Sequence, residues 1–371
     1  MEFHVIRNQV LSEMQLLTGV IEKKNTMPIL ANVLIKAENN QLTLKATDLE
    51  VGIISECAAQ VIEPGEFTVN AKRLFDMLST LTENQVSFSM NDGSMLDIVC
   101  GSSSFSIDIM PAKDYPAIPE YDFVGSVPMN NNFFQDCLNR VIFSISSDPH
   151  KYALNGAYLD IVNNQMSLVS TDGHRLSVVR CELSQDVDDF SAIIPRKTMN
   201  EVKKLLVAET EAENFLIGTH ETRIFFQVGK RVLFSRLIDG KYPDFEKAIP
   251  TNNDKEFVFE RAALLDIMRR KMVLSSEKSK LVRMSFSPGQ LVVVLKNPER
   301  GESVDTMEIE YQGEPIDIGF NILYIHDFLR NMSCEKIRVF LKDGGNQGLF
   351  RLVEDEPLDY RHVIMPMRLT G

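Results

Sequence analysis

Hydrophobic and polar positions recur along the chain with a period of about one third of its length. Three short apolar or alternating runs start about 124 and then 125 residues apart, as an array of tandem repeats requires. Each follows a turn sequence (Asn39-Asn40, Asn163-Asn164 and Pro288-Gly289), so each is predicted to be a strand leaving a hairpin. The runs are Gln41-Leu42-Thr43-Leu44, Gln165-Met166-Ser167-Leu168 and Gln290-Leu291-Val292-Val293.

Helical spacing of apolar residues keeps the same period. Three helices are predicted from i, i+3, i+4, i+7 patterns, the middle one less strict, and an earlier helix is predicted in each third. The first set is Leu74, Met77, Leu78 and Leu81; Met199, Val202, Leu205 and Leu206; and Ile325, Phe328, Leu329 and Met332. The earlier set is Leu11, Met14, Leu17 and Ile21; Phe134, Cys137, Leu138 and Val141; and Leu264, Met268 and Met272.

Alternating runs such as Val86–Met90 and Phe105–Ile109 lie between these landmarks and predict antiparallel strands. A sheet of this kind buries one face under helices and leaves the other to solvent. We therefore predict the α+β class, with three tandem similar domains of two helices packed on antiparallel sheet. The polar joints at Pro119–Asn132 and Pro250–Lys255 place the domains at 1–125, 126–253 and 254–371.

Composition narrows the class of protein. The chain is 44% hydrophobic and 25% charged, which is ordinary globular usage and excludes a disordered or disulfide-scaffold protein. The five cysteines are widely separated and form no C-x-x-C pair, which indicates reduced thiols in the cytoplasm rather than metal ligands. Neither a signal peptide nor a membrane span is predicted. A net charge of −13 argues against a protein that binds nucleic acid over its whole surface, but a small basic surface is compatible with it.

Motifs for catalysis or cofactor binding are scarce. The sequence contains no phosphate-binding loop, no dinucleotide-binding turn, no H-E-x-x-H and no G-x-S-x-G. The segment Ser170–Leu176 holds Asp172 and His174, which could form a carboxylate–imidazole dyad with Ser170 or Thr171 as nucleophile. Such partners usually converge from distant parts of a chain, so a glycine-containing turn is the favoured interpretation.

Seven motifs, in order from residue 25 to the C-terminus, resemble the bacterial DNA polymerase III beta subunit, the replicative sliding clamp. They are Asn25-Thr26-Met27-Pro28-Ile29-Leu30-Ala31-Asn32, Ala46-Thr47-Asp48-Leu49-Glu50, Leu154-Asn155-Gly156, Thr171-Asp172-Gly173-His174-Arg175-Leu176, Ile194-Pro195-Arg196-Lys197, Asp239-Gly240-Lys241-Tyr242-Pro243-Asp244 and Met365-Pro366-Met367-Arg368-Leu369. The ordered set is specific, although no single motif is decisive.

The resemblance implies a cytoplasmic, non-enzymatic processivity factor without cofactor or metal. Two chains would join head to tail, so that six domains close into a ring with sheets outside and helices lining the hole. The ring would encircle duplex DNA without sequence specificity and tether the polymerase III catalytic subunit. The clamp loader, other polymerases and repair proteins would bind through short peptides, and no membrane is involved. An acidic exterior with a basic hole would reconcile this function with the net charge.

The resemblance also implies three sets of site residues. A partner-peptide pocket between the second and third domains would be formed by Leu154, Thr171, Gly173, His174, Arg175, Leu176, Pro243, Lys247, Tyr324, Val363, Met365, Pro366, Met367, Arg368 and Leu369. DNA would be contacted by Lys24, Lys72, Lys151, Tyr152, Arg196 and Lys197, with Arg269-Arg270-Lys271 adding positive charge. The dimer interface would hold Phe105 and Ile107 against Val273 and Leu274, with Arg73 facing Glu299 and Glu302.

The sequence departs from the family pattern at two places, and two alternative functions remain to be distinguished from the sliding clamp. Lys247 stands where the family often has arginine, and Thr370-Gly371 extends beyond the usual terminal leucine. A hydrolase using Asp172 and His174 would show turnover. A monomeric peptide-binding adaptor would share the pocket but would not be retained on circular DNA.

Overall fold

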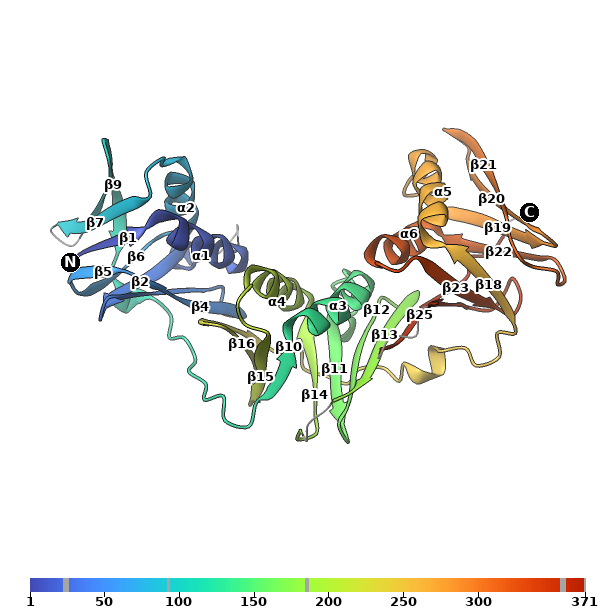
Figure 1. Ribbon diagram of the computed structural model, residues 1–371, viewed down its shortest axis with the longest axis horizontal. Coiled ribbons are helices and arrows are strands. Elements are labelled where there is room, and N and C mark those ends of the chain that lie inside the picture. Colours follow the sequence, from blue (N-terminus) through green and yellow to red (C-terminus); the bar gives the residue numbers. More distant parts are fainter. Residues whose placement is uncertain (23–26, 92–93, 184–186, 354–357, 370–371) are drawn as a thin grey trace. The chain divides into compact units, whose positions relative to one another are not determined.

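The computed structural model describes residues 1–22, 27–91, 94–183, 187–353 and 358–369 (Figure 1). By their contacts the residues form two compact units. Unit 1 comprises Met1–Gln135 and Lys197–Leu237, and unit 2 comprises Asp136–Arg196 and Ile238–Gly371. The first repeat of the sequence lies wholly in unit 1 and the third in unit 2, whereas the second repeat contributes strands to both.

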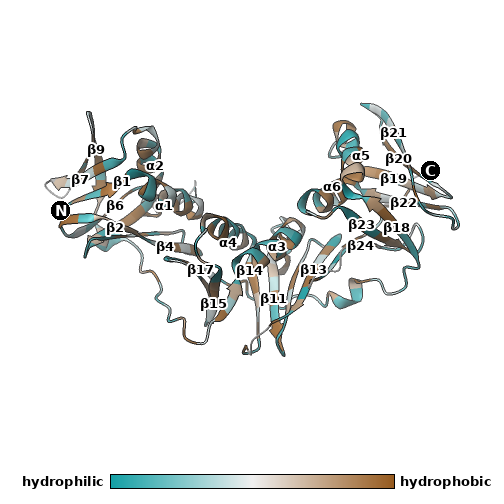
Figure 2. Ribbon diagram, viewed as in Figure 1, coloured by the Kyte–Doolittle hydropathy of each residue, from teal (hydrophilic) through white to brown (hydrophobic). Residues whose placement is uncertain are grey.

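The first repeat places two helices beside antiparallel strands. Helix α2 begins where the Asn70 side chain accepts a hydrogen bond from the backbone N–H of Arg73 (2.9 Å), and its apolar stripe buries Leu74 and Leu78. Both helices combine hydrophobic and hydrophilic residues (Figure 2). The elements are β1 (Glu2–Ile6), α1 (Arg7–Val20), β2 (Asn32–Glu38), β3 (Gln41–Thr47), β4 (Val51–Ala58), β5 (Gln60–Glu63), β6 (Gly65–Asn70), α2 (Ala71–Thr80), β7 (Gln85–Asn91), β8 (Met95–Cys100) and β9 (Ser103–Met110).

The second repeat follows the same order with one strand fewer. Strands β10, β15, β16 and β17 belong to unit 1, and β11 to β14 belong to unit 2. The elements are β10 (Val127–Asn130), α3 (Asn131–Val141), β11 (Gly156–Val162), β12 (Gln165–Thr171), β13 (Arg175–Glu182), β14 (Phe190–Pro195), α4 (Arg196–Ala208), β15 (Asn214–His220), β16 (Arg223–Val228) and β17 (Arg231–Arg236).

The third repeat completes unit 2. Its second helix, α6, is capped like α2, because the Asn321 side chain accepts the backbone N–H of Leu323 (3.1 Å). The elements are β18 (Lys255–Glu260), α5 (Arg261–Leu274), β19 (Leu281–Ser287), β20 (Gln290–Asn297), β21 (Gly301–Glu308), β22 (Ile316–Asn321), α6 (Ile322–Asn331), β23 (Lys336–Leu341), β24 (Gly348–Leu352) and β25 (Asp359–Ile364).

Sheet pairing joins successive repeats by the same two types of strand. In unit 1 the order is β10-β15-β16-β17-β4-β3-β2-β6-β9-β8-β7-β1-β5, so the fourth strand of the first repeat, β4, pairs with the last strand of the second, β17. In unit 2 the order β14-β11-β12-β13-β25-β24-β23-β18 joins β13 of the second repeat to β25 of the third in the same way. A further sheet of unit 2 has the order β21-β20-β19-β22.

The predicted α+β fold class, with its strands and helices, is confirmed. The three glutamine-led runs lie in β3, β12 and β20, and each follows a turn whose residues have positive φ, including Asn39 (50°), Asn163 (50°) and Gly289 (76°). The predicted joint at Pro119–Asn132 is too long, since Val127 already begins β10. Its polar residues include the asparagines around the start of α3, where Asn130 accepts the N–H of Phe133 (3.0 Å). The domain boundaries themselves stay a prediction.

Candidate functional site

The predicted pocket residues meet where β13 and β25 pair in unit 2. Leu176 lies opposite Val363 in the ladder, and the backbone N–H of Met365 donates to the carbonyl of His174 (2.9 Å), which extends the pairing past the strand end. Both strands alternate sides, so Leu176 and Val363 face one apolar cluster with Tyr242. Leu176 and Val363, which are separated by more than a hundred positions in the sequence, therefore belong to one buried apolar cluster.

This apolar cluster is wider than the sequence prediction. Leu154 packs against it as predicted, but so do Tyr158 and Phe245, which the resemblance did not mark. The Tyr158 and Tyr242 rings stack with centroids 5.0 Å apart. The only sequence signal for the added residues was their apolar character in strands and loops. The buried members of the apolar cluster are Val169, Leu176, Val178, Ile193, Ile238, Tyr242, Ile249 and Val363. The partly buried residues that pack against them are Ala153, Leu154, Tyr158, Phe245, Ala248 and Leu349.

The turn between β12 and β13 shapes one edge of the pocket. Asp172 accepts the backbone N–H groups of His174 (2.9 Å) and Arg175 (3.0 Å), and Gly173 has φ +89°, a conformation that costs glycine little. The contact between Asp172 and His174 thus uses the His174 backbone rather than its imidazole. Thr171 donates its hydroxyl proton to the Arg175 carbonyl (2.6 Å). These side chains build a turn, and the geometry gives no support to the catalytic dyad.

Arg175 ties this turn to the third repeat. Its guanidinium forms ion pairs with Asp172 (3.1 Å) and with Asp327 on α6 (2.7 Å), and it lies over the ring of Tyr324 with its Cζ 4.5 Å from the centroid. Such a planar fork suits simultaneous pairing and stacking. Only 10% of its side chain is exposed, so Arg175 holds the pocket together more than it offers a charge to a ligand. Asp327 was missed because nothing in the sequence relates α6 to a turn 150 residues earlier.

A buried polar contact lies beneath the pocket. His362 on β25 shares a hydrogen bond through Nδ1 with the hydroxyl of Ser177 on β13 (2.9 Å), and its ring stacks on Phe328 at 5.1 Å. The imidazole is fully buried, and burial, aided by the positive charge of Arg175, lowers its pKa well below the ordinary value. His362 is therefore neutral at neutral pH.

The remaining residues predicted for the pocket are on or near the surface of unit 2. The C-terminal segment runs back along the sheet edge, where the backbone N–H of Met367 donates to the Gly319 carbonyl (2.7 Å). Lys247 points away into solvent and pairs with Asp244 (2.8 Å). Thr370 and Gly371 lie outside the described residues. Exposed or half-exposed members are Gly173, His174, Pro243, Met365, Pro366, Met367, Arg368 and Leu369.

The predicted DNA-contacting residues are in mixed environments. Lys72 and Tyr152 are exposed, whereas Lys151 donates to the carbonyl of Asp172 (2.7 Å). Lys197 pairs with Asp48 and Glu22, so part of its charge is neutralised. Arg196 begins α4 and is exposed, and Lys24 lies outside the described residues.

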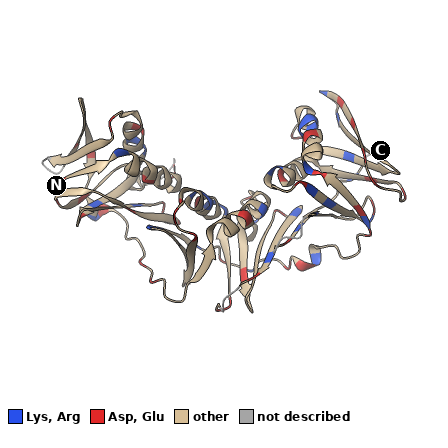
Figure 3. Ribbon diagram, viewed as in Figure 1, with Lys and Arg blue, Asp and Glu red and all other residues tan. Residues whose placement is uncertain are grey.

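The expectation that Arg269-Arg270-Lys271 adds positive charge for contact with DNA is wrong for Lys271. Its side chain is fully buried and forms an ion pair with Asp305 on β21, because burial of an ammonium requires a close partner. Asp305 also pairs with Arg270 (2.7 Å), and Arg269 pairs with Asp266 on α5 itself (3.1 Å). Helix α5 carries residues of both charges (Figure 3). The pairs that Arg270 and Lys271 form with Asp305 link α5 to β21.

The predicted interface residues are divided between the two units. Phe105 and Ile107 are on β9 in unit 1, with Ile107 only 8% exposed. Val273 is 74% exposed at the end of α5 in unit 2, beside half-buried Leu274. Arg73, Glu299 and Glu302 are all exposed, and Glu302 pairs with Lys296 (3.1 Å).

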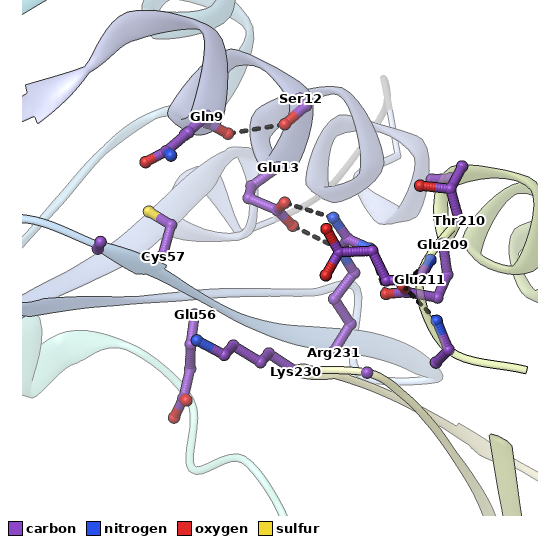
Figure 4. A pocket seen from close by; sticks show the side chains of 14 residues that line it. Gln9, Ser12, Glu13, Glu56, Cys57, Glu209, Thr210, Glu211, Lys230 and Arg231 are labelled. Carbon is purple, nitrogen blue, oxygen red and sulfur yellow. Dashed lines mark hydrogen bonds and ion pairs between the residues drawn. The ribbon is translucent and has the colours of Figure 1, made fainter. Parts of the chain in front are cut away.

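A second cavity, of about 630 Å³, lies in unit 1 where α1 and β4 approach the β16–β17 turn (Figure 4). Three of its charged groups pair with one another: Arg231 donates two hydrogen bonds to Glu13 (2.6 and 2.7 Å) and pairs with Glu209 (3.3 Å). Burial raises the pKa of the Cys57 thiol to about 12, so no thiolate is present at neutral pH. The ion pairs around this cavity join the first repeat to the second, and the cavity offers no reactive group.

The described part of the chain holds neither a cluster of metal ligands nor a helix suited to cross a membrane. No group of histidine, cysteine, aspartate and glutamate residues is arranged to hold a metal ion. None of the described helices has the length and apolar character that a membrane crossing needs.

Comparison with known proteins covers the whole chain. Models of the DNA polymerase III beta subunit match its N-terminal domain at residues 1–119, its central domain at 128–244 and its C-terminal domain at 246–368. The beta sliding clamps of Pseudomonas putida and Vibrio cholerae are 34% and 32% identical to it, each over 100% of both chains. The solved structure of the DNA polymerase III subunit beta from Pseudomonas aeruginosa has a TM-score of 0.91 at 32% identity, and that from Bartonella birtlesii bound to griselimycin has 0.93 at 31%, each covering 100% of both chains.

Proposed function

Because the chain belongs to the DNA polymerase III beta subunit family, and its function is that of a DNA sliding clamp, we propose that two copies close head to tail around duplex DNA. Full-length similarity to curated sliding clamps supports the function, and the repeated strand pairing supports the ring. A closed ring retains the DNA by topology, so weak contacts suffice. Tethering raises the effective concentration of a bound polymerase at the primer end.

The proposal of a ring depends on one observation: successive repeats are joined by the same kind of strand pairing. The fourth strand of one repeat pairs with the last strand of the next at β4–β17 and again at β13–β25. Applied once more, the rule pairs β21 of one chain with β9 of its partner. Among described residues β21 pairs only with β20, and β9 pairs with β8 and, at Ile109 and Met110 alone, with β6. Both strands thus keep a free edge, and head-to-tail pairing of two chains satisfies both.

Apolar contacts beside this new strand pair would supply most of the binding energy. We place Phe105 and Ile107 against the partner's Val273 and Leu274, at about 1.5–3 kcal/mol per large side chain buried. Arg73 would face Glu299 and Glu302 at the rim, where ion pairs contribute little. The exposure of Val273 in the single chain agrees with this assignment.

The test of the ring is Leu274→Asp, which should give folded monomers that no longer stay on circular DNA. Size measurement by light scattering reports the dimer, and loss of retention after the DNA is linearised reports encirclement. The matched control is Val162→Asp. It likewise replaces a partly exposed aliphatic side chain by a carboxylate, but outside the proposed interface. A Leu274→Asp protein that remains dimeric at micromolar concentration contradicts the assignment.

The pocket at β13–β25 is proposed to bind short peptides of the replicative polymerase, the clamp loader, other polymerases and repair proteins. Its chemistry supports this role: a buried apolar floor at Leu176 and Val363 lies beside the flexible thioethers of Met365 and Met367, which adapt to different apolar side chains. A related clamp has been solved bound to griselimycin, and another with polyethylene glycol at a putative beta-motif tethering region. Affinity in the micromolar range would allow the partners to exchange.

DNA contact in the ring is proposed to be weak and independent of sequence. Lys24, Lys72, Lys151 and Tyr152 would face phosphates, while Arg196 and Lys197 act from the start of α4. Each phosphate neutralised adds about −0.9 to the slope of log affinity against log salt concentration. Lys24→Ala with Lys72→Ala should flatten this slope without changing the dimer mass, and an unchanged slope would place both residues outside the hole.

We further propose that the protein has no catalytic activity and acts in the cytoplasm beside the replicated DNA. Asp172 supports the first point because it is engaged by backbone N–H groups and by Arg175. His174→Ala should weaken peptide binding and leave esterase, phosphatase and nuclease assays at background. Turnover by the wild-type protein that disappears in this variant would favour the hydrolase instead.

A further inference from the structure

The first strand of the first repeat shows what can occupy the edge of such a domain. Strand β1 pairs with β7 on one side and with the short strand β5 on the other, where Phe3 lies opposite Val61 and His4 opposite Gln60. Strand β5 follows β4 after a turn in which the backbone N–H of Ala59 donates to the carbonyl of Asn40 (3.1 Å). An extended segment thus completes this edge of the sheet.

The third repeat has the same turn but leaves the corresponding edge open. The backbone N–H of Ile309 donates to the carbonyl of Gly289 (3.1 Å), as Ala59 does in the first repeat. Beyond it, no strand forms beside β18, which within the described residues pairs only with β23. A groove of about 540 Å³ remains between β18 and Met307–Glu310.

Charge and exposure define what this groove can receive. Four carboxylates line it against a single ammonium, that of Lys336, which pairs with Glu260 (3.2 Å). Between the carboxylates lie apolar side chains, of which Val258 is 47% exposed. The lining residues that matter here are Glu256, Val258, Glu260, Met307, Glu308, Ile309 and Glu310.

We propose that this groove is a second docking site, distinct from the β13–β25 pocket, for an extended peptide of another protein in which lysine or arginine alternates with apolar residues. The peptide adds to the free edge of β18 as β5 adds to β1, so that main-chain hydrogen bonds supply affinity. Alternation puts its apolar side chains on Val258 and Ile309 and its cations toward Glu308 and Glu310. Opposite charge on the groove favours encounter with such a segment.

Formation of the proposed ring need not cover this groove. Unit 1 contains the corresponding place next to a completed junction, a smaller groove of about 270 Å³ at Val5, Ile6 and Ala58–Gln60. It is lined only by residues of the first repeat, although β17 of the second repeat pairs with β4 alongside. A partner's β9 on β21 therefore need not cover the β18 groove, and both docking sites can be filled together.

The test uses the full-length protein and a fluorescein-labelled eight-residue peptide of alternating lysine and valine, blocked at both ends. Fluorescence anisotropy should show saturable binding that weakens at least tenfold in the Glu308→Lys, Glu310→Lys double variant. The matched control reverses two exposed carboxylates in unit 1, Glu211→Lys with Glu213→Lys, which changes the net charge equally and should alter affinity less than twofold. Amide hydrogen exchange in β18 should slow when the peptide binds.

Three outcomes would overturn the proposal. Equal weakening by both double variants would mean general attraction to an acidic protein. Slowed exchange at β13 or β25 instead of β18 would mean binding in the other pocket. Absence of saturable binding, together with self-association of the Glu308→Lys, Glu310→Lys variant, would mean that the carboxylates only guard a free edge against pairing with a second copy. A peptide with proline at its centre should bind at least tenfold more weakly, because proline removes a main-chain donor.

Discussion

The two junctions between repeats share one turn and differ in what surrounds it. At the first, Asp48 accepts the backbone N–H groups of Glu50 (2.9 Å) and Val51 (2.7 Å), and Thr47 donates its hydroxyl proton to the Val51 carbonyl (2.9 Å). At the second, Asp172 and Thr171 make the same bonds to His174 and Arg175. A threonine–aspartate pair thus specifies the turn twice, once in each unit.

The two junctions differ in the side chains within and around the turn. The positive-φ position is Leu49 (φ 81°) at the first and Gly173 (φ 89°) at the second. Lys197 pairs with Asp48 at the first, whereas Arg175 pairs with Asp172 at the second and stacks on Tyr324. Ion pairs occupy the first surface, and an apolar cluster with thioethers at its rim forms the second.

The strand pairs next to the turn, β4–β17 and β13–β25, also differ in polarity. Opposite residues Ile53 and Leu233 form an apolar pair at the first junction, in the place that Ser177 and His362 occupy at the second. The comparison teaches that the shared turn and strand pairing are scaffold. The proposed peptide binding and the expected sensitivity to pH would depend on a few residues that differ between the two junctions.

The largest effect should come from removing the segment present only at the second junction. Deleting Met367–Gly371 should abolish binding of a glutamine-, leucine- and phenylalanine-containing peptide, at least a hundredfold, because two apolar side chains lose about 1.5–3 kcal/mol each. Fluorescence anisotropy measures binding, and light scattering should show an unchanged dimer. Leu49→Ala at the first junction is the control and should bind normally. Full-strength binding by the truncated protein would refute the pocket assignment.

The next effect concerns the two cations. Arg175→Met should cost about 3 kcal/mol of unfolding free energy, since removing one partner of a buried pair leaves Asp172 and Asp327 uncompensated. Lys197→Met should cost about 1 kcal/mol, because Lys197 is more exposed than Arg175. Shifts of the urea midpoint measure both. Equal shifts would mean that the two junctions are braced alike.

The third effect is a dependence on pH that only the second junction should show. The folded-state pKa of His362 lies well below its unfolded value of about 6.5, so the unfolded chain binds the proton first and stability falls as pH drops below 6.5. Between pH 7.5 and 5.5 this residue should cost about 1.4 kcal/mol. His362→Phe, which suits the surrounding rings of Phe143, Phe328 and Phe350, should lose less stability over that range in urea melts. Parallel losses in both proteins would contradict a buried neutral imidazole.

The smallest effect tests the positive-φ positions. Gly173→Ala should lower stability by about 1 kcal/mol, because a side chain strains the backbone there and its Cβ would approach Lys151 Nζ at 3.2 Å. Leu49→Gly relieves the same strain and should raise stability by about 0.5 kcal/mol, since glycine's entropy cost offsets part of the gain. Thermal unfolding compares the pair. Opposite signs are expected, and a destabilising Leu49→Gly would mean that the Leu49 side chain makes contacts worth more than the strain.

Local pattern alone determined much of this protein. The spacing of Leu74, Leu78 and their counterparts predicts the helices, and Asn39-Asn40 predicts a hairpin, because both depend on interactions between residues near in sequence. Because these local patterns recur three times along the chain, the sequence also predicts three similar domains. The resemblance then named candidate pocket residues, including Leu154 and Met365, and that assignment stays a prediction.

Tertiary structure alone decided which charges are available and which distant groups meet. Lys197 and Lys271 are equivalent to any other lysine in the sequence, yet one is ion-paired and the other is fully buried against Asp305. Asp327 reaches Arg175, and His362 reaches Ser177, only because β13 and β25 pair across two repeats. Burial and long-range pairing are properties of the packed chain: a residue's own identity sets its hydrogen-bonding groups and charge, but the neighbours that satisfy them come from segments whose approach no local pattern encodes.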